Sequence, residues 1–325
     1  MGDYYRILSL SGGGARGIFQ ASVLKYMEES LKKDEVELSE CFEMYCGTST
    51  GAIIALALGY GETAESINDM YEKKLSDVFP RRFPEHLVSP KHKIISRLLK
   101  ALSQLNKLKS PVYKMERLKA VLDSFYGNRI LRDLSKDVIV TASRINQFSH
   151  HTFASGSMCE NLNQDIFIAD AAASSAAAPI YFEPVCPKGA GQQLLYADGG
   201  LWANSPSLIG VISAHKYRNK AFDKIKVMSI GTGDFNDGAQ KSDFIRKPSH
   251  SVGILAINMM FATQDAADEY YTKKLIGENN YIKINYSHKE LIEIDDVVMS
   301  SEILPQKAQV QIQDCYQKIK SFIGV

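Results

Sequence analysis

One serine in this chain has small residues spaced around it in the way that a nucleophile requires. Ser49 is the centre of Gly47-Thr48-Ser49-Thr50-Gly51, which lies between an apolar strand-like run and an apolar helix-forming run. A sharp turn from strand to helix lifts the serine hydroxyl clear of the backbone, and glycines two residues to either side avoid Cβ clashes. The start of the following helix favours negative charge at the same point. The spacing predicts a nucleophile, with an ordinary tight turn as the alternative.

A glycine-rich turn precedes this serine and follows the predicted first strand, residues 4–9. Its sequence is Gly12-Gly13-Gly14-Ala15-Arg16-Gly17, which leaves backbone N–H groups bare just before a helix. Such a turn is typical of an anion site. Three interpretations are open: a dinucleotide fingerprint formed by the first, third and sixth of these residues, an oxyanion hole, or a plain flexible turn.

The second predicted strand, residues 42–46, helps to choose between these interpretations. The dinucleotide interpretation needs an acidic residue at the end of that strand, and none is present. A right-handed crossover between the first two strands places their two glycine turns side by side. Bare N–H groups beside an exposed serine suit acyl transfer better than hydride transfer.

A third motif, Asp198-Gly199-Gly200, ends a predicted strand over residues 194–198. We expect Ser205 to cap the next helix and Pro206 to occupy its first position. Further strands are predicted at 137–142, 151–153, 226–230 and 281–285, and helices after 17 and at 62–75, 118–126, 165–178, 252–275 and 304–323. Strands alternating with helices predict an α/β fold with a parallel sheet.

Composition limits the classes of protein that are possible. The 325 residues suffice for one large α/β domain or two small ones, and the net charge of +1 gives no general preference for polyanions. The five cysteines are widely spaced without a C-x-x-C pair, so neither a zinc site nor a disulfide framework is indicated. The opening residues lack the pattern of a secretory signal, and the apolar runs are too short to span a bilayer. A cytoplasmic location is expected.

Residues 80–109 differ from the rest of the chain in charge. They contain eight Lys or Arg residues and one acidic residue, with apolar residues at helical spacing between them. A basic amphipathic helix of this kind favours contact with an anionic membrane surface, an anionic ligand or a partner. The alternative is a solvated insertion that rests on the core.

Taken together, the three motifs resemble those of the patatin-like phospholipases. Two other stretches, 177–182 (Ala-Ala-Pro-Ile-Tyr-Phe) and 229–233 (Ser-Ile-Gly-Thr-Gly), are also similar to that family, and the resemblance covers residues 6–233. Where the family often has Asn-Asn-Pro, this chain has Asn204-Ser205-Pro206. The resemblance implies a three-layer αβα fold with a mainly parallel sheet. It implies one domain over 1–325, with a basic helical insertion at about 80–110 and a C-terminal helical extension at about 250–325.

The resemblance also implies a chemistry. Ser49 attacks an ester carbonyl and Asp198 accepts its proton, so that the two form a dyad. The oxyanion is expected to bind at Gly12, Gly13 and Gly14, with Arg16 nearby. No metal and no cofactor are expected.

Two other classes of function remain as alternatives. An α/β-hydrolase uses Ser, Asp and His in that order, and His215, His250 and His288 all follow Asp198. Several strands precede the serine in that fold, however, whereas one or two do so here. A dyad predicts an acidic limb of the rate profile well below the ordinary histidine pKa of about 6.5. The non-enzymatic alternative is a nucleotide-binding module in which Ser49 is structural.

A narrower resemblance is to the bacterial patatin-like effectors of cyclic-nucleotide antiphage systems. It rests on residues 6–17 and on the long insertion, and it implies a cyclic dinucleotide activator and assembly into a homo-oligomer on activation. The implied substrates are membrane phospholipids, reached peripherally at the inner membrane, without DNA or RNA as partners. An unregulated lipase or esterase of the same family is the alternative.

Overall fold

The computed structural model describes residues 4–80, 111–155, 158, 165–188, 194–235, 249–288 and 292–325. The predicted basic insertion at about 80–110 lies outside these residues, apart from Pro80. Within the described part, no helix combines the length and apolar character needed to cross a bilayer.

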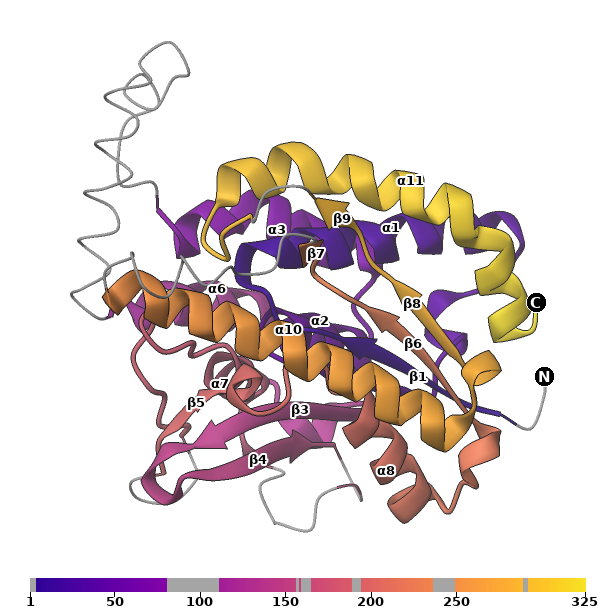
Figure 1. Cartoon of the computed structure of the whole chain (residues 1–325), viewed down its shortest axis with the longest axis horizontal. Coiled ribbons are helices and arrows are strands. Elements are labelled where there is room, and N and C mark those ends of the chain that lie inside the picture. Colours follow the sequence, from indigo (N-terminus) through magenta and orange to yellow (C-terminus); the bar gives the residue numbers. More distant parts are fainter. Residues whose placement is uncertain are drawn as a thin grey trace.

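A seven-stranded sheet forms the centre of the fold (Figure 1). Its main path has the order β4-β3-β2-β1-β6-β8, and β5 pairs with β3 beside that path. The strands are β1 (Tyr5–Leu10), β2 (Met44–Gly47), β3 (Asp137–Arg144), β4 (Ser149–Ala154), β5 (Tyr196–Asp198), β6 (Ile225–Ile230) and β8 (Tyr281–Ile284). Every pairing among β3, β2, β1, β6 and β8 is parallel, while β4 and β5 run antiparallel to β3. The prediction of a mainly parallel sheet is confirmed.

Helices cover both faces of this sheet because its central strands are apolar on both sides. All six residues of β1 are buried. Leu8 and Leu10 belong to one hydrophobic cluster, and Tyr5 and Ile7 belong to the other. Successive side chains of a strand point to opposite faces, so this alternation places an apolar layer on each side.

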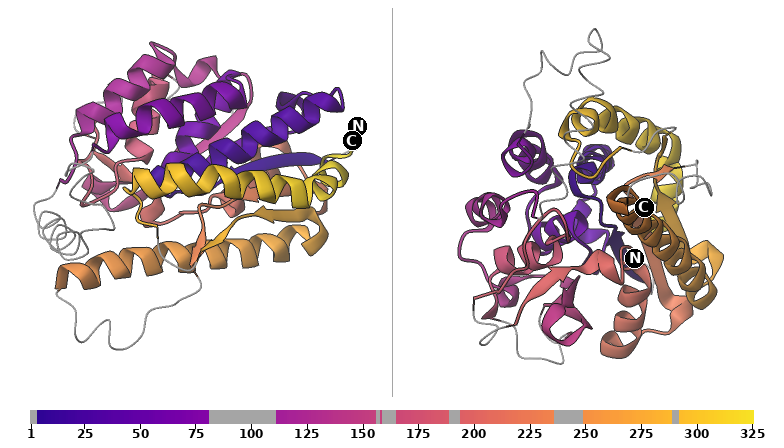
Figure 2. Two further views of the ribbon diagram at one scale, coloured as in Figure 1. Left: turned by 90° about the horizontal axis from the view of Figure 1, so that it is seen from above. Right: turned by 60° about the vertical axis from the view of Figure 1, so that its left-hand side comes forward.

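The larger cluster is covered by α1, α2, α3, α6, α7 and α11, and the smaller one by α8 and α10 (Figure 2). Their bounds are α1 (Gly17–Lys33), α2 (Thr50–Tyr60), α3 (Ala64–Val78), α6 (Met115–Tyr126), α7 (Ile168–Ser175), α8 (Ser207–Arg218), α10 (Ser249–Ile276) and α11 (Val297–Ile323). A small parallel pair, β7 (Asp234–Phe235) and β9 (Ser287–His288), lies beyond β6 and β8. The arrangement is the predicted three-layer αβα fold.

Most helix starts differ from the predictions by two or three residues, and those of α8 and α11 differ for identifiable reasons. The α8 helix begins at Ser207, with Pro206 in the N-cap position, because the Ser205 hydroxyl donates to Asp268 and does not cap the helix. The α11 helix begins at Val297, well before the predicted residue 304, and continues through Pro305. The Asp296 carboxylate caps it by accepting the N–H of Met299. The C-terminal part of the chain also supplies β8 to the sheet, at the place of the strand predicted at 281–285.

Candidate active site

The sheet brings Ser49 and Asp198 together because β2 and β5 meet end to end along one side of β3. The last pair between β2 and β3 is Gly47 with Val140, and β5 begins its pairing two residues further along β3, where Asp198 lies opposite Ala142. Since β2 runs parallel and β5 antiparallel to β3, their carboxyl ends face each other. Ser49 follows the end of one strand and Asp198 is the end of the other.

Ser49 lies in a strained turn at the start of α2. Its φ of 55° and ψ of −120° fall in a region that residues other than glycine rarely adopt, and such strain is concentrated at functional sites. The Ser49 N–H donates to the Ser175 hydroxyl of α7 at 2.9 Å, which holds the turn in place. A Cβ on Gly51 would lie 2.2 Å from the carbonyl oxygen of Leu10, so the turn needs glycine at that position.

Thr48 connects this turn to its surroundings. Its hydroxyl donates to the carbonyl oxygen of Ala203 at 2.7 Å and also hydrogen-bonds with the Thr141 hydroxyl of β3 at 2.7 Å. Ala203 belongs to the segment from Asp198 to the start of α8, which we call the aspartate loop (residues 198–206). The serine turn and the aspartate loop are therefore joined directly.

Asp198 has the environment of a base that works near neutral pH. The residue is 2% exposed, and its Oδ1 accepts the N–H of Gly200 at 2.7 Å. Burial raises the pKa of this carboxyl to about 6, although hydrogen bonding with Gly200 and with the Ser49 side chain opposes the rise. The expectation of an acidic limb well below 6.5 did not include the desolvation of this carboxylate, which shifts the expected limb upward, toward about 6.

Among the residues we call the glycine loop (residues 12–17), Gly13 and Gly14 offer N–H groups to a ligand. Within the described part of the chain, neither N–H has a protein acceptor, and both residues line the same pocket as Ser49. Gly12 does not fit its predicted role in the oxyanion hole, because its N–H already donates to the carbonyl oxygen of Asn204 at 3.0 Å. The N–H of Ala15 donates to Ile294 at 2.7 Å.

Arg16 supports the glycine loop from outside the pocket. The side chain is buried, does not line the pocket, and donates from Nε to the carbonyl oxygen of Gly13 at 3.2 Å. Thr232, within the second stretch of family resemblance, donates its hydroxyl to the carbonyl oxygen of Gly12 at 2.7 Å. Thr232 therefore holds the glycine loop, a role that the sequence of residues 229–233 alone does not indicate.

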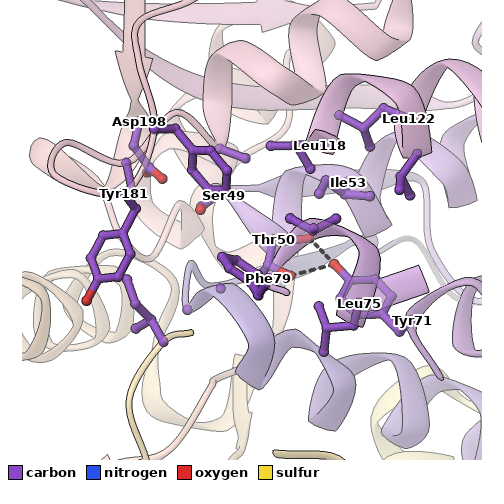
Figure 3. Close-up of a pocket in the computed structure, with 18 of the residues that line it drawn as sticks. Ser49, Thr50, Ile53, Tyr71, Leu75, Phe79, Leu118, Leu122, Tyr181 and Asp198 are labelled. Atoms are coloured by element: carbon purple, nitrogen blue, oxygen red, sulfur yellow. Dashed lines mark hydrogen bonds between the residues drawn. The ribbon is translucent and has the colours of Figure 1, made fainter. Parts of the chain in front are cut away.

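The pocket around these groups is mostly apolar (Figure 3). Ser49 and Asp198 lie together on one side of it, and apolar side chains from α2, α3 and α6 extend away from them. The apolar lining includes Ile53, Met70, Leu75, Val78, Phe79, Leu118, Val121, Leu122, Phe182, Phe261 and Ile294. We call these residues the apolar wall. Sequence reasoning missed them, because pocket-facing residues on an amphipathic helix have the same spacing as core residues.

The histidines do not complete a triad in the described part of the chain. No histidine whose side chain is described lines the pocket. His215 stacks on Phe222, and its Nδ1 hydrogen-bonds with the carbonyl oxygen of Lys220, while His288 lies in β9. One described strand, β1, precedes β2, unlike the several strands expected of an α/β-hydrolase. The same described residues hold no group of three or more His, Cys, Asp or Glu side chains placed to bind a metal ion.

Comparison with known proteins agrees with this geometry. The family model described as patatin-like phospholipase matches residues 8–210, which include the glycine loop, Ser49 and Asp198. The chain is 30% identical over 238 residues to a "cGAMP-activated phospholipase" of Escherichia coli (strain TW11681), covering 70% of this chain and 62% of the relative. It is also 30% identical over 242 residues to the protein of that name from Vibrio cholerae, covering 70% and 64%. The chain thus spans less than two thirds of the length of these two relatives.

Among solved structures, VipD from Legionella pneumophila has a similar fold. The TM-score is 0.51 at 14% sequence identity, and the match covers 98% of this chain and 67% of VipD. At this identity the likeness concerns the fold alone. It extends the similarity beyond residue 210, into the part of the chain that contains α10 and α11.

Proposed function

Because the chain belongs to the patatin-like phospholipase family, we propose that it hydrolyses fatty-acyl esters of membrane phospholipids. Ser49 is the nucleophile and Asp198 the base. The observation that carries this proposal is the meeting of a strained serine, a buried carboxylate and two unpaired backbone N–H groups in one apolar pocket.

The reaction has two halves. In the first, Asp198 accepts the hydroxyl proton while Ser49 Oγ bonds to the ester carbonyl carbon, and the N–H groups of Gly13 and Gly14 bind the oxyanion. The bond from carbon to the alcohol oxygen then breaks, and Asp198 returns the proton to that oxygen, so that a lysophospholipid leaves. In the second half, Asp198 accepts a proton from water while the water oxygen bonds to the acyl carbon. The bond from that carbon to Ser49 Oγ then breaks, and Asp198 returns the proton to Oγ, so that the fatty acid leaves and Ser49 is restored.

The apolar wall supports a fatty-acyl substrate. Contact with side chains of α3 and α6 removes the apolar surface of a bound acyl chain from water. This burial contributes about 25 cal/mol of binding free energy for each Å², which favours a long hydrocarbon chain over a small polar acyl group. The substrate lies in a bilayer, so the enzyme acts in peripheral contact with the membrane surface.

We further infer that a cyclic dinucleotide activates the hydrolysis. The support is the name of the two relatives, "cGAMP-activated phospholipase". The basic segment that the sequence suggests for an anionic ligand lies outside the described residues.

The test measures fatty-acid release from vesicles of bacterial phospholipids, with and without a panel of cyclic dinucleotides. The wild type is compared with Ser49→Ala and with Ser301→Ala, which alters an exposed serine of α11. We expect release by the wild type and by Ser301→Ala, and none by Ser49→Ala.

Each outcome bears on a separate part of the proposal. Ser49-dependent release that requires a nucleotide supports both the hydrolase and its activation. Ser49-dependent release of equal rate without a nucleotide supports the hydrolase and overturns the activation. Absence of Ser49-dependent release under every condition overturns the hydrolase itself.

A further inference from the structure

The α10 helix lies outside the segment that the family model matches, yet its side chains hold the aspartate loop. Gln264 uses both ends of its amide for this purpose. Its Oε1 accepts the N–H of Asn204 at 3.1 Å, and its Nε2 donates to the carbonyl oxygen of Leu201 at 3.1 Å. The loop between Asp198 and α8 is therefore fastened to α10 through its backbone.

Asp265, the next residue of α10, fixes the side chain of Asn204. Both of its carboxylate oxygens accept hydrogen bonds from Asn204 Nδ2, at 3.0 and 3.2 Å. An ionised carboxylate can only accept, so the amide must turn its Nδ2 toward Asp265 and its Oδ1 away. That Oδ1 faces the glycines of the site, since a Cβ built on Gly12 would lie 2.5 Å from it and one on Gly200 3.2 Å from it.

Asn204 is the residue at which the two catalytic loops are joined. Its carbonyl oxygen accepts the N–H of Gly12 at 3.0 Å, next to the proposed oxyanion donors. Its own backbone belongs to the loop that begins at Asp198, and it also lines the pocket. A shift of Asn204 would therefore move the glycine loop relative to the carboxylate that serves as base.

We propose that Gln264 and Asp265 are positioning residues, which act through Asn204 to hold the glycine loop and the aspartate loop in the relative position that the reaction requires. This inference rests on the proposed hydrolase function, and it assigns to α10 a task outside the matched segment. Asp268, one turn further on, anchors a different point, because it accepts the Ser205 hydroxyl at 2.7 Å and the N–H of Leu208 at 2.8 Å.

The charge on Asp265 makes this positioning dependent on pH. Enclosure of its carboxylate, with a smaller contribution from the nearby Asp268, raises the pKa to about 7, while Asn204, Lys283 and Arg16 oppose the rise. Once protonated, Asp265 can donate to an amide oxygen, so the Asn204 side chain can turn over and Oδ1 leaves the glycines. The two loops therefore keep their relative position while Asp265 is ionised.

Two nearly isosteric variants test the proposal. Asp265→Asn gives residue 265 a donor as well as an acceptor, so the orientation of Asn204 is no longer imposed. Gln264→Glu removes the donor to Leu201. The matched control is Thr263→Ala, an exposed neighbour whose hydroxyl bonds only to carbonyl oxygens of its own helix, those of Met259 and Met260.

With a soluble short-chain ester, both variants should lower kcat by about 10²-fold with KM changed by less than about twofold, because misplacement of catalytic groups by about 1 Å has this effect. Thr263→Ala should match the wild type. The acidic limb of kcat in the wild type should be steeper than one ionisation allows, because Asp198 and Asp265 must both be ionised. In Asp265→Asn it should have the slope of one ionisation.

Hydrogen exchange gives a readout that does not depend on turnover. The amide of Gly12 should exchange faster in Asp265→Asn and Gln264→Glu than in Thr263→Ala, at equal melting temperature. The proposal is overturned if a folded variant has the same kcat, the same pH profile and the same Gly12 exchange rate as the wild type. If Asp265→Asn does not fold, the measurements on Gln264→Glu decide. Loss of Ser49-dependent turnover in the wild type would instead overturn the proposed function, and the exchange measurement would still test the positioning.

Discussion

Replacement of Asp198 by asparagine should abolish hydrolysis and at the same time stabilise the folded protein at alkaline pH. Asp198 is buried, and its pKa rises from the ordinary value of 3.8 to about 6 on folding. A carboxyl whose pKa is raised binds its proton more tightly in the folded state than in the unfolded state. Ionising it therefore costs folding free energy.

The size and the pH range of this cost follow from the two pKa values. A difference of one pKa unit corresponds to about 1.4 kcal/mol, so the rise from 3.8 to about 6 corresponds to about 3 kcal/mol. The cost is absent below the unfolded-state pKa, develops as the pH rises, and is complete above the folded-state pKa. Because pH 4 lies slightly above 3.8, about 0.5 kcal/mol of the cost is already present there, and wild-type Asp198 should destabilise the fold by about 2.5 kcal/mol at pH 8 relative to pH 4.

Urea denaturation of the wild type and of Asp198→Asn, at about pH 4 and pH 8, isolates this contribution. Asparagine keeps the shape of the side chain and can still accept the N–H of Gly200, so the comparison between the two pH values removes effects common to both. Between pH 4 and pH 8, the free energy of unfolding of Asp198→Asn should rise by about 2.5 kcal/mol relative to that of the wild type.

Ser49→Ala serves as the control for this measurement, because it abolishes activity while keeping the carboxylate. It removes the side-chain hydrogen bond that lowers the pKa of Asp198, so its stability should depend on pH at least as strongly as that of the wild type. If the stabilities of Asp198→Asn and the wild type change in parallel with pH, the carboxylate is solvated and the reasoning is refuted.

Two further substitutions test the oxyanion loop and the apolar wall. In Gly13→Ala the new Cβ would lie 2.4 Å from the Thr232 side chain, so the loop must move. We expect kcat on a soluble ester to fall by about 10²–10³-fold while the protein remains folded. An unchanged kcat would exclude Gly13 as a donor. In Leu75→Trp a larger side chain fills the pocket, so kcat/KM for a long-chain ester should fall by about 10- to 200-fold relative to a short-chain ester; an equal fall for both esters would place the acyl chain elsewhere.

Local patterns in the sequence predicted the first half of the site well. The apolar run of β1, the two glycine turns and the amphipathic α1 are features of consecutive residues, and parallel pairing of β1 with β2 places both turns at one edge of the sheet, as expected. The strand that ends at Asp198 was also predicted, because the Asp-Gly-Gly motif follows an apolar run.

The remaining features depend on pairings between distant residues, which no local pattern records. Nothing in residues 194–198 indicates that β5 runs antiparallel to β3 and meets β2 end to end. The sequence predicts a helix at 252–275, whereas the contacts of α10 with Asn204 depend on where the helix packs. The raised pKa of Asp198 likewise results from burial by the whole fold.

Residues near 294 and 323 brace the glycine loop and β1, and this has a consequence during protein synthesis. The carbonyl oxygen of Ile294 accepts the N–H of Ala15 in the glycine loop, and the guanidinium of Arg6 donates to the carbonyl oxygen of Ile323 at 2.8 Å. Ser49 and Asp198 are synthesised before residues 294 and 323, so the proposed catalytic pair exists before the glycine loop and β1 have these braces. The proposed hydrolysis should therefore require that α11 has already packed on α1.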